Sequence, residues 1–226
     1  LDFEDLETDS SASSNLKKQE GSYDDLYFNY GLNYDLRDSP YRPTSGYRTS
    51  FYQTLPVVSA NQEIQNILTA TKYKTLNETS GMVGMASLYL SSVHTLSNSN
   101  DVRISKRGNI PYNRLRGFER NKVGPIDNDD YIGGNYVTAL NLATNLPGLF
   151  PTVENVDISY FIDVANVWGV DYSSAIDDSN VIRSSTGISL DLLTAVGPLS
   201  FSWTAPITQK NTDKTETFRF NLGTTF

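Results

Sequence analysis

The chain alternates between apolar and polar residues over many short stretches. Period-two alternation places successive side chains on opposite faces of a β-strand. In the stretch 26–37, the apolar face carries Leu26, Phe28, Tyr30, Leu32, Tyr34 and Leu36. In the terminal stretch 218–226, the apolar face carries Phe218, Phe220, Leu222 and Phe226, and the opposite face carries Gly223. The pattern predicts strands with one apolar face each.

The same alternation predicts nine strands and the remnant of a tenth. The strands are expected at 26–37, 46–56, 64–76, 82–93, 134–146, 156–165, 182–193, 199–206 and 218–226. Residues 1–8 resemble the end of a further strand, and 9–25 resemble a polar surface loop with one helical turn. Tight connections alternate broadly with long ones. The longest, 96–132, is rich in Asn, Arg, Gly and Asp, and loops of that length are usually functional.

Strand length and composition favour a membrane barrel. The stretches are close to the roughly 9–11 residues that a tilted strand needs to cross a bilayer. No apolar run approaches the roughly 20 residues of a spanning helix. An apolar content of 38%, with 12% aromatic residues including 14 tyrosines, suits a polar lumen and interfacial aromatic girdles. We therefore predict an all-β fold, a transmembrane antiparallel β-barrel, with a soluble β-sandwich as the alternative.

The alternation also assigns a face to each side chain, and a slip of one residue would invert a whole strand. The side chains expected to face outward, toward lipid, are Phe28, Tyr30, Leu32, Ile158, Tyr160, Ile162, Leu190, Leu192, Phe201, Trp203, Phe220 and Leu222. Those expected to face the lumen are Asn29, Asn33, Asp157, Asp163, Ser189, Asp191, Ser202 and Asn221.

Composition excludes several classes of function. The net charge of −8 argues against a nucleic-acid partner. The absence of cysteine excludes disulfides and thiol catalysis. The single histidine, His94, serves no Ser-His-Asp triad and is expected at the surface. The acidic run 127–130 offers oxygen ligands for Ca²⁺, but a solvated loop is the favoured interpretation. We predict no enzyme activity, no catalytic residue, no metal and no cofactor.

Four groups of residues occur in a characteristic order along the chain. They are 34–38 with 43–48; 115–118 (Leu-Arg-Gly-Phe) with 123–125 and 132–135; 161–163 with 167–168; and 197–199 with the terminal strand. This ordered set resembles the barrel of the BamA family of outer-membrane protein assembly factors. The related TamA translocation factors share the Arg-Gly-Phe loop, so a TamA-like relative is a second interpretation.

The resemblance implies a barrel of about sixteen strands in the outer membrane of a Gram-negative bacterium. Residues 1–226 would supply the C-terminal part of that barrel as an up-and-down meander, open and strongly curved. Family members carry periplasmic POTRA domains ahead of the barrel, and none is recognised within 1–226. Because the chain begins with Leu1, we interpret it as a fragment or a processed piece.

In the family, the long loop folds back into the lumen, where its arginine pairs with acidic groups on the strands. The resemblance therefore implies that Arg116, Gly117 and Phe118 form the lumen loop motif, with Asp163 as the partner of Arg116. The position of a second acidic partner is Ala143 here, which departs from the family pattern. Asp191, on the same inward face, is a candidate replacement.

The implied function is the assembly and insertion of β-barrel proteins into the outer membrane. The implied partners are unfolded β-barrel clients, outer-membrane lipid and the lipoproteins of an assembly complex. The terminal strand 218–226 would be a weak seam, because glycine at position 223 weakens strand pairing. An ordinary closing strand is the alternative for this segment. A porin or receptor that conducts small solutes is the alternative for the whole chain.

Overall fold

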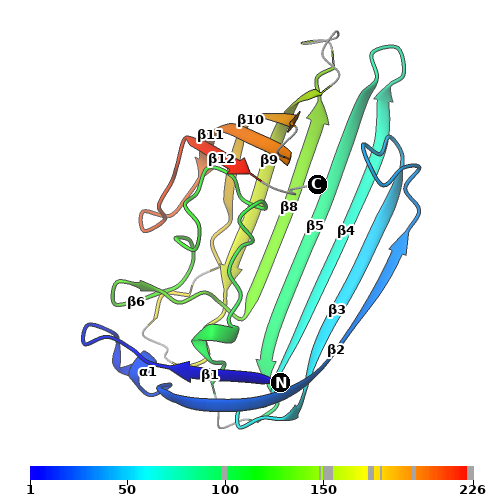
Figure 1. Ribbon diagram of the computed structural model, residues 1–226. Helices are drawn as coiled ribbons and strands as arrows, with labels where there is room; N and C mark the ends of the chain where they lie inside the picture. The colour runs from blue at the N-terminus through cyan, green and yellow to red at the C-terminus, as the bar shows by residue number, and fades with distance from the viewer. Residues whose placement is uncertain are drawn as a thin grey trace.

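Ten strands form one antiparallel sheet in the computed structural model, which describes residues 1–97, 101–147, 149, 155–172, 176–178, 180–194 and 197–222 (Figure 1). In sheet order the strands are β1 (Asp2–Leu6), β2 (Gly21–Asp35), β3 (Gly46–Val58), β4 (Glu63–Asn77), β5 (Met82–Thr95), β8 (Tyr136–Asn145), β9 (Val156–Trp168), β10 (Arg183–Thr194), β11 (Gly197–Thr208) and β12 (Phe218–Leu222). Each strand of the sheet therefore pairs with its neighbours in the chain, as expected of an up-and-down meander.

Four short elements of the described chain lie outside this sheet. They are the hairpin strands β6 (Ile126–Asp127) and β7 (Asp130–Tyr131), the helix α1 (Ser14–Lys17) and a 3-10 turn at Ile104–Lys106. None of the described residues forms a helix that is long and apolar enough to cross a membrane.

Two sequence expectations need correction. Residues 21–25 belong to β2 rather than to the surface loop 9–25, because the first strand pairs with them, from Asp2 opposite Asp25 to Leu6 opposite Gly21. The loop 96–132 was expected to lack regular structure, but it contains the β6–β7 hairpin and the 3-10 turn.

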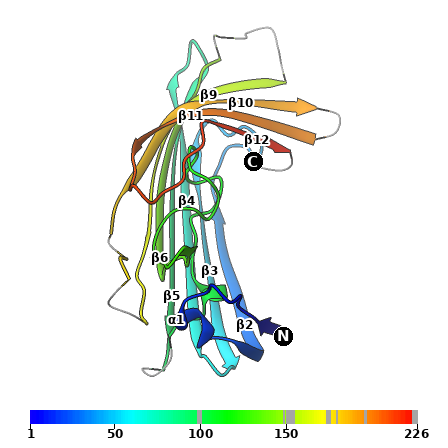
Figure 2. The ribbon, with the colours of Figure 1, turned by 90° about the vertical axis from the view of Figure 1, so that its left-hand side faces the viewer.

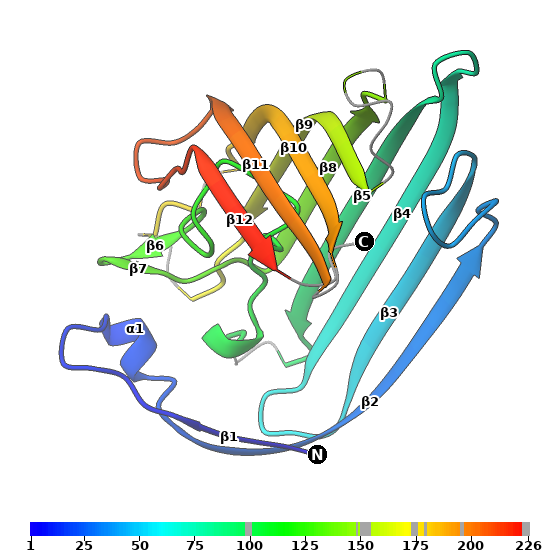
Figure 3. The ribbon, with the colours of Figure 1, turned by 45° about the horizontal axis from the view of Figure 1, so that its top comes forward.

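The sheet curves strongly and stays open. Figures 2 and 3 show the strands wrapping around a concave side, with β1 and β12 at its two edges. Among the described residues, these two edge strands do not pair with each other. The prediction of an open, curved portion of a barrel is therefore confirmed.

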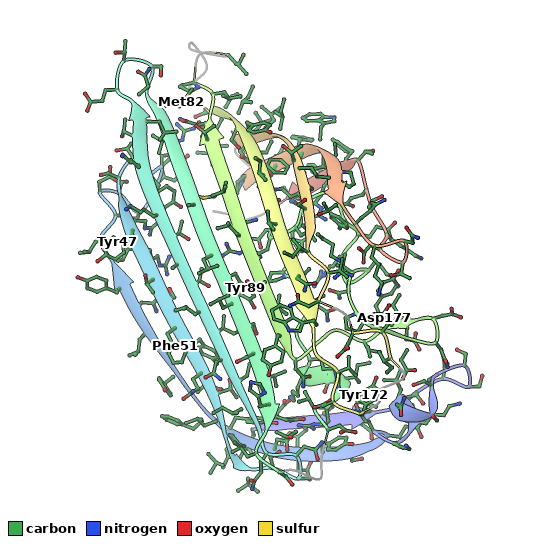
Figure 4. The ribbon with its side chains drawn as sticks, turned by 180° about the vertical axis from the view of Figure 1, so that it is seen from behind. Tyr47, Phe51, Met82, Tyr89, Tyr172 and Asp177 are labelled. Atoms are coloured by element: carbon green, nitrogen blue, oxygen red, sulfur yellow. The ribbon has the colours of Figure 1, made fainter. Side chains whose placement is uncertain are left out.

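Connections at the two ends of the strands differ in length. The turns 36–45 and 78–81 lie at one end, and the loops 7–20, 96–135, 169–182 and 209–217 lie at the other, together with one short turn at 59–62. In Figure 4, Met82 marks the first end, and Tyr172 and Asp177 mark the opposite end. This asymmetry is typical of barrels with short periplasmic turns and longer outer loops.

The two faces of the sheet differ in polarity. Large apolar side chains are exposed on the convex face, for example Phe28, Leu32, Tyr160, Trp203, Phe220 and Leu222. Polar side chains alternate with them and are buried on the concave face, for example Asn141, Asp163, Ser189 and Ser202. The faces assigned from alternation agree with this arrangement. Exposed apolar surface of this extent requires a partner, and lipid is the partner that the strand lengths favour.

Two prolines sit inside strands where the pairing register shifts. Pro56 in β3 lies opposite Tyr27, next to a shift between β2 and β3. Pro206 in β11 lies opposite Ser185, next to a shift between β10 and β11. Because proline has no N–H to donate, it is tolerated in sheets mainly at edges and bulges.

A small apolar core forms where the long loop packs on the concave face of β8 and β9. Its buried members are Leu115, Phe118, Val123, Val137, Ala139, Ala165 and Val167. Gly124, at φ +116°, permits this contact, because a Cβ there would lie 2.5 Å from Cγ1 of Val167. The core therefore belongs to the loop and the sheet together.

We expect an arginine on the convex face to destabilise the barrel more than an arginine on the concave face. Phe28→Arg should cost about 2–4 kcal/mol in a bilayer, since it places a charge in hydrocarbon. The adjacent Asn29→Arg should be milder, because Asn29 lines an open hollow on the concave side. Urea unfolding in lipid vesicles measures both; equal costs would contradict the assignment of faces.

Candidate functional site

The long loop crosses the concave face, and Arg116 holds it there (Figures 1 and 3). Nε of Arg116 donates to Oδ2 of Asp163 at 2.8 Å, and Nη2 donates to Oδ1 at 2.8 Å. The backbone N–H of Arg116 also donates to Oδ2, at 3.1 Å. Asp163 is 0% exposed. The carboxylate therefore receives a bidentate, charge-assisted contact from the loop, which fixes both position and orientation.

An aromatic ring completes the surroundings of this guanidinium. Cζ of Arg116 lies 3.3 Å from the centroid of the Phe161 ring. Phe161 points inward from β9 and packs over Gly187 of β10, where a Cβ would lie 2.8 Å from Cζ of Phe161. A cation stacked on a desolvated ring gains about 2 kcal/mol. Glycine at 187 thus makes room for the ring that supports the arginine.

Gly117 allows the loop to turn against the sheet. Its φ of +91° is in the left-handed region, which strains other residues. A Cβ on Gly117 would also lie 3.2 Å from Oγ1 of Thr204 and 3.3 Å from Cβ of Ser185. Ser185 in turn donates its hydroxyl to the backbone carbonyl of Arg116. The close approach between loop and sheet depends on glycine at this position.

Phe118 connects the motif to the last described strand. Its side chain is 2% exposed, and its backbone forms an antiparallel bridge with Thr215. Arg219 of β12 points inward and donates from Nη2 to the carbonyl of Phe118 at 2.5 Å. Arg219 also donates to the carbonyl of Tyr112 and to the carboxylate of Glu216. Sequence reasoning missed Arg219, although alternation places it on the inward face.

Asn141 is the second partner of Asp163. Its Nδ2 donates to Oδ1 of Asp163 at 2.8 Å and to the carbonyl of Arg114 at 2.9 Å. Nη1 of Arg114 donates to Oδ1 of Asn141 at 3.2 Å and to Oγ of Ser87 at 2.6 Å. A neutral amide in β8 therefore ties the loop to the same carboxylate.

The sequence expectation concerned a different contact, a second acidic partner of Arg116. That expectation centred on Ala143, with Asp191 as a replacement. Asp191 does face inward, opposite Asp157 and Ser200, but among the described residues no hydrogen bond joins it to Arg116. Asn141 lies on the same face as Ala143, two residues earlier in β8. An inward amide between the inward alanines at 139 and 143 was the signal that could have identified it.

The residues of the terminal strand are only partly described. Phe218, Phe220 and Leu222 lie on the convex face beside Phe201 and Trp203, and ring centroids in this group are as close as 5.1 Å. Gly223 and Phe226 lie outside the described residues. The described part of β12 pairs with 199–203 of β11, although β11 continues to Thr208.

The acidic run 127–130 is not simply a solvated loop. Asp127 is 8% exposed and accepts hydrogen bonds from the hydroxyl of Ser13 and from Nδ2 of Asn15. It therefore anchors α1 to the β6–β7 hairpin. His94 is half-buried, with its ring 5.1 Å from that of Tyr136. Within the described ranges, no cluster of His, Cys, Asp or Glu could hold a metal ion.

We expect Asn141→Ala to loosen the long loop. It removes the amide that joins Asp163 to the loop backbone, a loss of about 1–3 kcal/mol for buried polar groups left without a partner. Leu142→Ala, on the opposite face of the same strand, is the matched control. Trypsin cleavage after the exposed Arg120 reports loop release. Equal cleavage rates in the two variants would contradict this role for Asn141.

Comparisons with known proteins identify the family to which this fold belongs. The model of the Omp85 superfamily domain matches residues 2–226. The chain is 27% identical over 117 residues to outer membrane protein assembly factor BamA of Neorickettsia risticii (strain Illinois), covering 50% of this chain and 16% of that protein. It is 32% identical over 143 residues to BamA of Neisseria meningitidis serogroup B (strain ATCC BAA-335 / MC58), covering 50% and 17%.

The fold is also similar to that in the crystal structure of BamA from Haemophilus ducreyi lacking POTRA domains 1–3. The TM-score is 0.75 at 27% identity, and the match covers 88% of this chain and 42% of that chain. The chain thus spans less than half the length of these relatives. The resemblance drawn from the sequence is confirmed, and the family model covers nearly every residue. This chain belongs to the Omp85 superfamily.

Proposed function

We propose that this chain is the C-terminal part of the barrel of an outer-membrane protein assembly factor in a Gram-negative bacterium. In this role it folds and inserts other β-barrel proteins. One observation carries the proposal: a loop held by the Arg116–Asp163 pair crosses the polar concave face of a curved sheet whose convex face is apolar. Membership of the Omp85 superfamily and similarity to two BamA proteins support it.

The task requires no covalent chemistry. Backbone groups left unpaired in hydrocarbon cost several kcal/mol each, so spanning sheets normally close. A barrel with a weak seam can exchange its own edge pairing for pairing with an incoming strand, which is β-augmentation. By similarity to the family, the seam is assigned to the outer edge of β12, the last strand of the described sheet. The aromatic group around Phe201 and Trp203 lies on the lipid-facing side of the same edge.

The partners follow from this role. Unfolded β-barrel clients would pair with the β12 edge, and outer-membrane lipid would cover the convex face. The lipoproteins of an assembly complex are partners by resemblance to BamA. POTRA domains would lie upstream of residue 1 in the whole protein. A TamA-like translocation factor is the alternative within the superfamily, and a small-solute porin is the alternative outside it.

We expect Arg116→Ala to impair assembly more than it impairs the barrel. Loss of the bidentate contact frees the loop near the seam, which should raise the activation barrier to client folding. An increase of about 1.4 kcal/mol in that barrier slows client folding tenfold. Arg116→Lys should be intermediate, because lysine keeps the charge but not the planar double contact. The measurement is the folding rate of an unfolded β-barrel client in vesicles that contain the full-length protein.

Arg120→Ala is the matched control, because Arg120 is an exposed arginine of the same loop. Heat-dependent gel mobility reports whether each variant still forms a barrel. If Arg116→Ala lowers barrel stability and assembly activity to the same extent, the role of Arg116 is structural only. Altered solute flux through Arg116→Ala, with unchanged client folding, would favour the porin alternative.

A further inference from the structure

The long loop is fastened at a second point, upstream of Arg116. Arg103 is 0% exposed, although it lies between two strands in an outer loop. Its Nη2 donates to Oδ2 of Asp25 at 2.5 Å and to Oε2 of Glu63 at 3.0 Å. Its Nη1 donates to Oε2 of Glu4 at 3.3 Å. One guanidinium therefore joins carboxylates from three different strands, namely β1, β2 and β4.

Further contacts define the geometry of this cluster. The backbone N–H of Arg103 donates to Oε1 of Glu63 at 3.0 Å, and Nη2 also donates to the hydroxyl of Tyr27 at 2.9 Å. Cζ of Arg103 lies 4.4 Å from the ring centroid of Tyr23. Both the main chain and the side chain at this position are thus held. A planar guanidinium suits such a site, whereas a lysine ammonium does not.

The charges in the cluster depend on the arginine. Three carboxylates face one guanidinium, and Asp25 and Glu63 are almost fully buried. Burial alone would lower the pKa of Arg103, but the hydrogen bonds that it donates to Glu63 and Asp25 raise that pKa above its ordinary value. The cation is therefore permanent. Its removal would leave two buried carboxylates without a counter-charge, which is strongly destabilising.

The segment between the two fastening points is also held. Gln19 accepts from the N–H of Ile104 at 2.8 Å, which ties the loop 7–20 to the long loop. Gly108 pairs with Gly134 across the base of the loop. The loop is thus attached to the first strands at Arg103 and to β9 at Arg116, on opposite sides of the concave face (Figures 1 and 3).

We propose that Arg103 is a positioning residue that fixes the upstream end of the long loop to β1, β2 and β4, so that the loop spans the concave face as a strap and sets the separation of the first and last strands. This inference rests on the proposed function, because that separation matters only if the terminal edge admits a client. A loop held at only one of these points would not limit the distance between the strands on the two sides. A loop held at both points limits how far those strands can move apart.

The test separates positioning from simple stabilisation. Arg103→Met removes the charge and the hydrogen bonds but keeps much of the side-chain volume. The triple variant Arg103→Met, Asp25→Asn, Glu63→Gln also removes the two most deeply buried negative charges. We expect the single variant to lose heat stability and the triple variant to regain it. Both should keep a loosened loop and a several-fold slower client folding rate in the full-length protein.

Spin labels report loop position directly, since this chain has no cysteine of its own. One pair, Ser105→Cys with Gln62→Cys, spans the Arg103 end, and a second pair, Arg120→Cys with Gln209→Cys, spans the far end. We expect the first distance distribution to broaden in both Arg103 variants, with the second unchanged. Arg116→Ala should broaden the second pair and leave the first unchanged.

Two results would overturn the proposal. The first is a triple variant with a narrow Ser105–Gln62 distribution. The second is a triple variant with a broadened distribution but a wild-type folding rate, since the strap would then not matter for assembly. If the unmodified full-length protein folds no client, the proposed function fails. The label distances would still decide whether Arg103 holds the loop.

Discussion

Buried arginine–carboxylate contacts between one long loop and the inner face of the sheet are the interaction on which the rest of the structure depends. Arg116 contacts Asp163 at one side, and Arg103 contacts Asp25 and Glu63 at the other. Such pairs add little net stability, because desolvation offsets their attraction, but a lost partner leaves a buried charge. Their main effect is therefore to specify one loop position and one sheet geometry.

The same contacts explain why a polar concave face coexists with a small apolar core. The loop supplies Leu115, Phe118 and Val123, and the sheet supplies small side chains such as Ala139 and Ala165. Small residues beneath the loop permit close approach, and the arginines satisfy the polar groups around it. The concave face of β8 and β9 is thus covered by packed protein.

The proposed function requires a loop that is fixed to the concave face and a terminal strand that can exchange its pairing for a client strand. The loop is held by charge-assisted bonds to the concave face, whereas β12 lies at the edge of the described sheet. A client strand would add at the weak edge while the strapped loop keeps the curvature of the remaining sheet. Arg219, on β12, links the two parts, because it bonds the carbonyl of Phe118 from the edge strand itself.

The sequence by itself determined the strands, their faces and the meander, because period-two alternation is a local property of each strand. It also placed Asp163 on the inward face, and the family resemblance then paired it with Arg116. Only the tertiary structure decided that β2 begins at Gly21, that Asn141 also bonds Asp163, and that Arg103 contacts both Asp25 and Glu63. These contacts join residues far apart in the chain, and their partners are set by how the loop crosses the curved sheet, which no local pattern records.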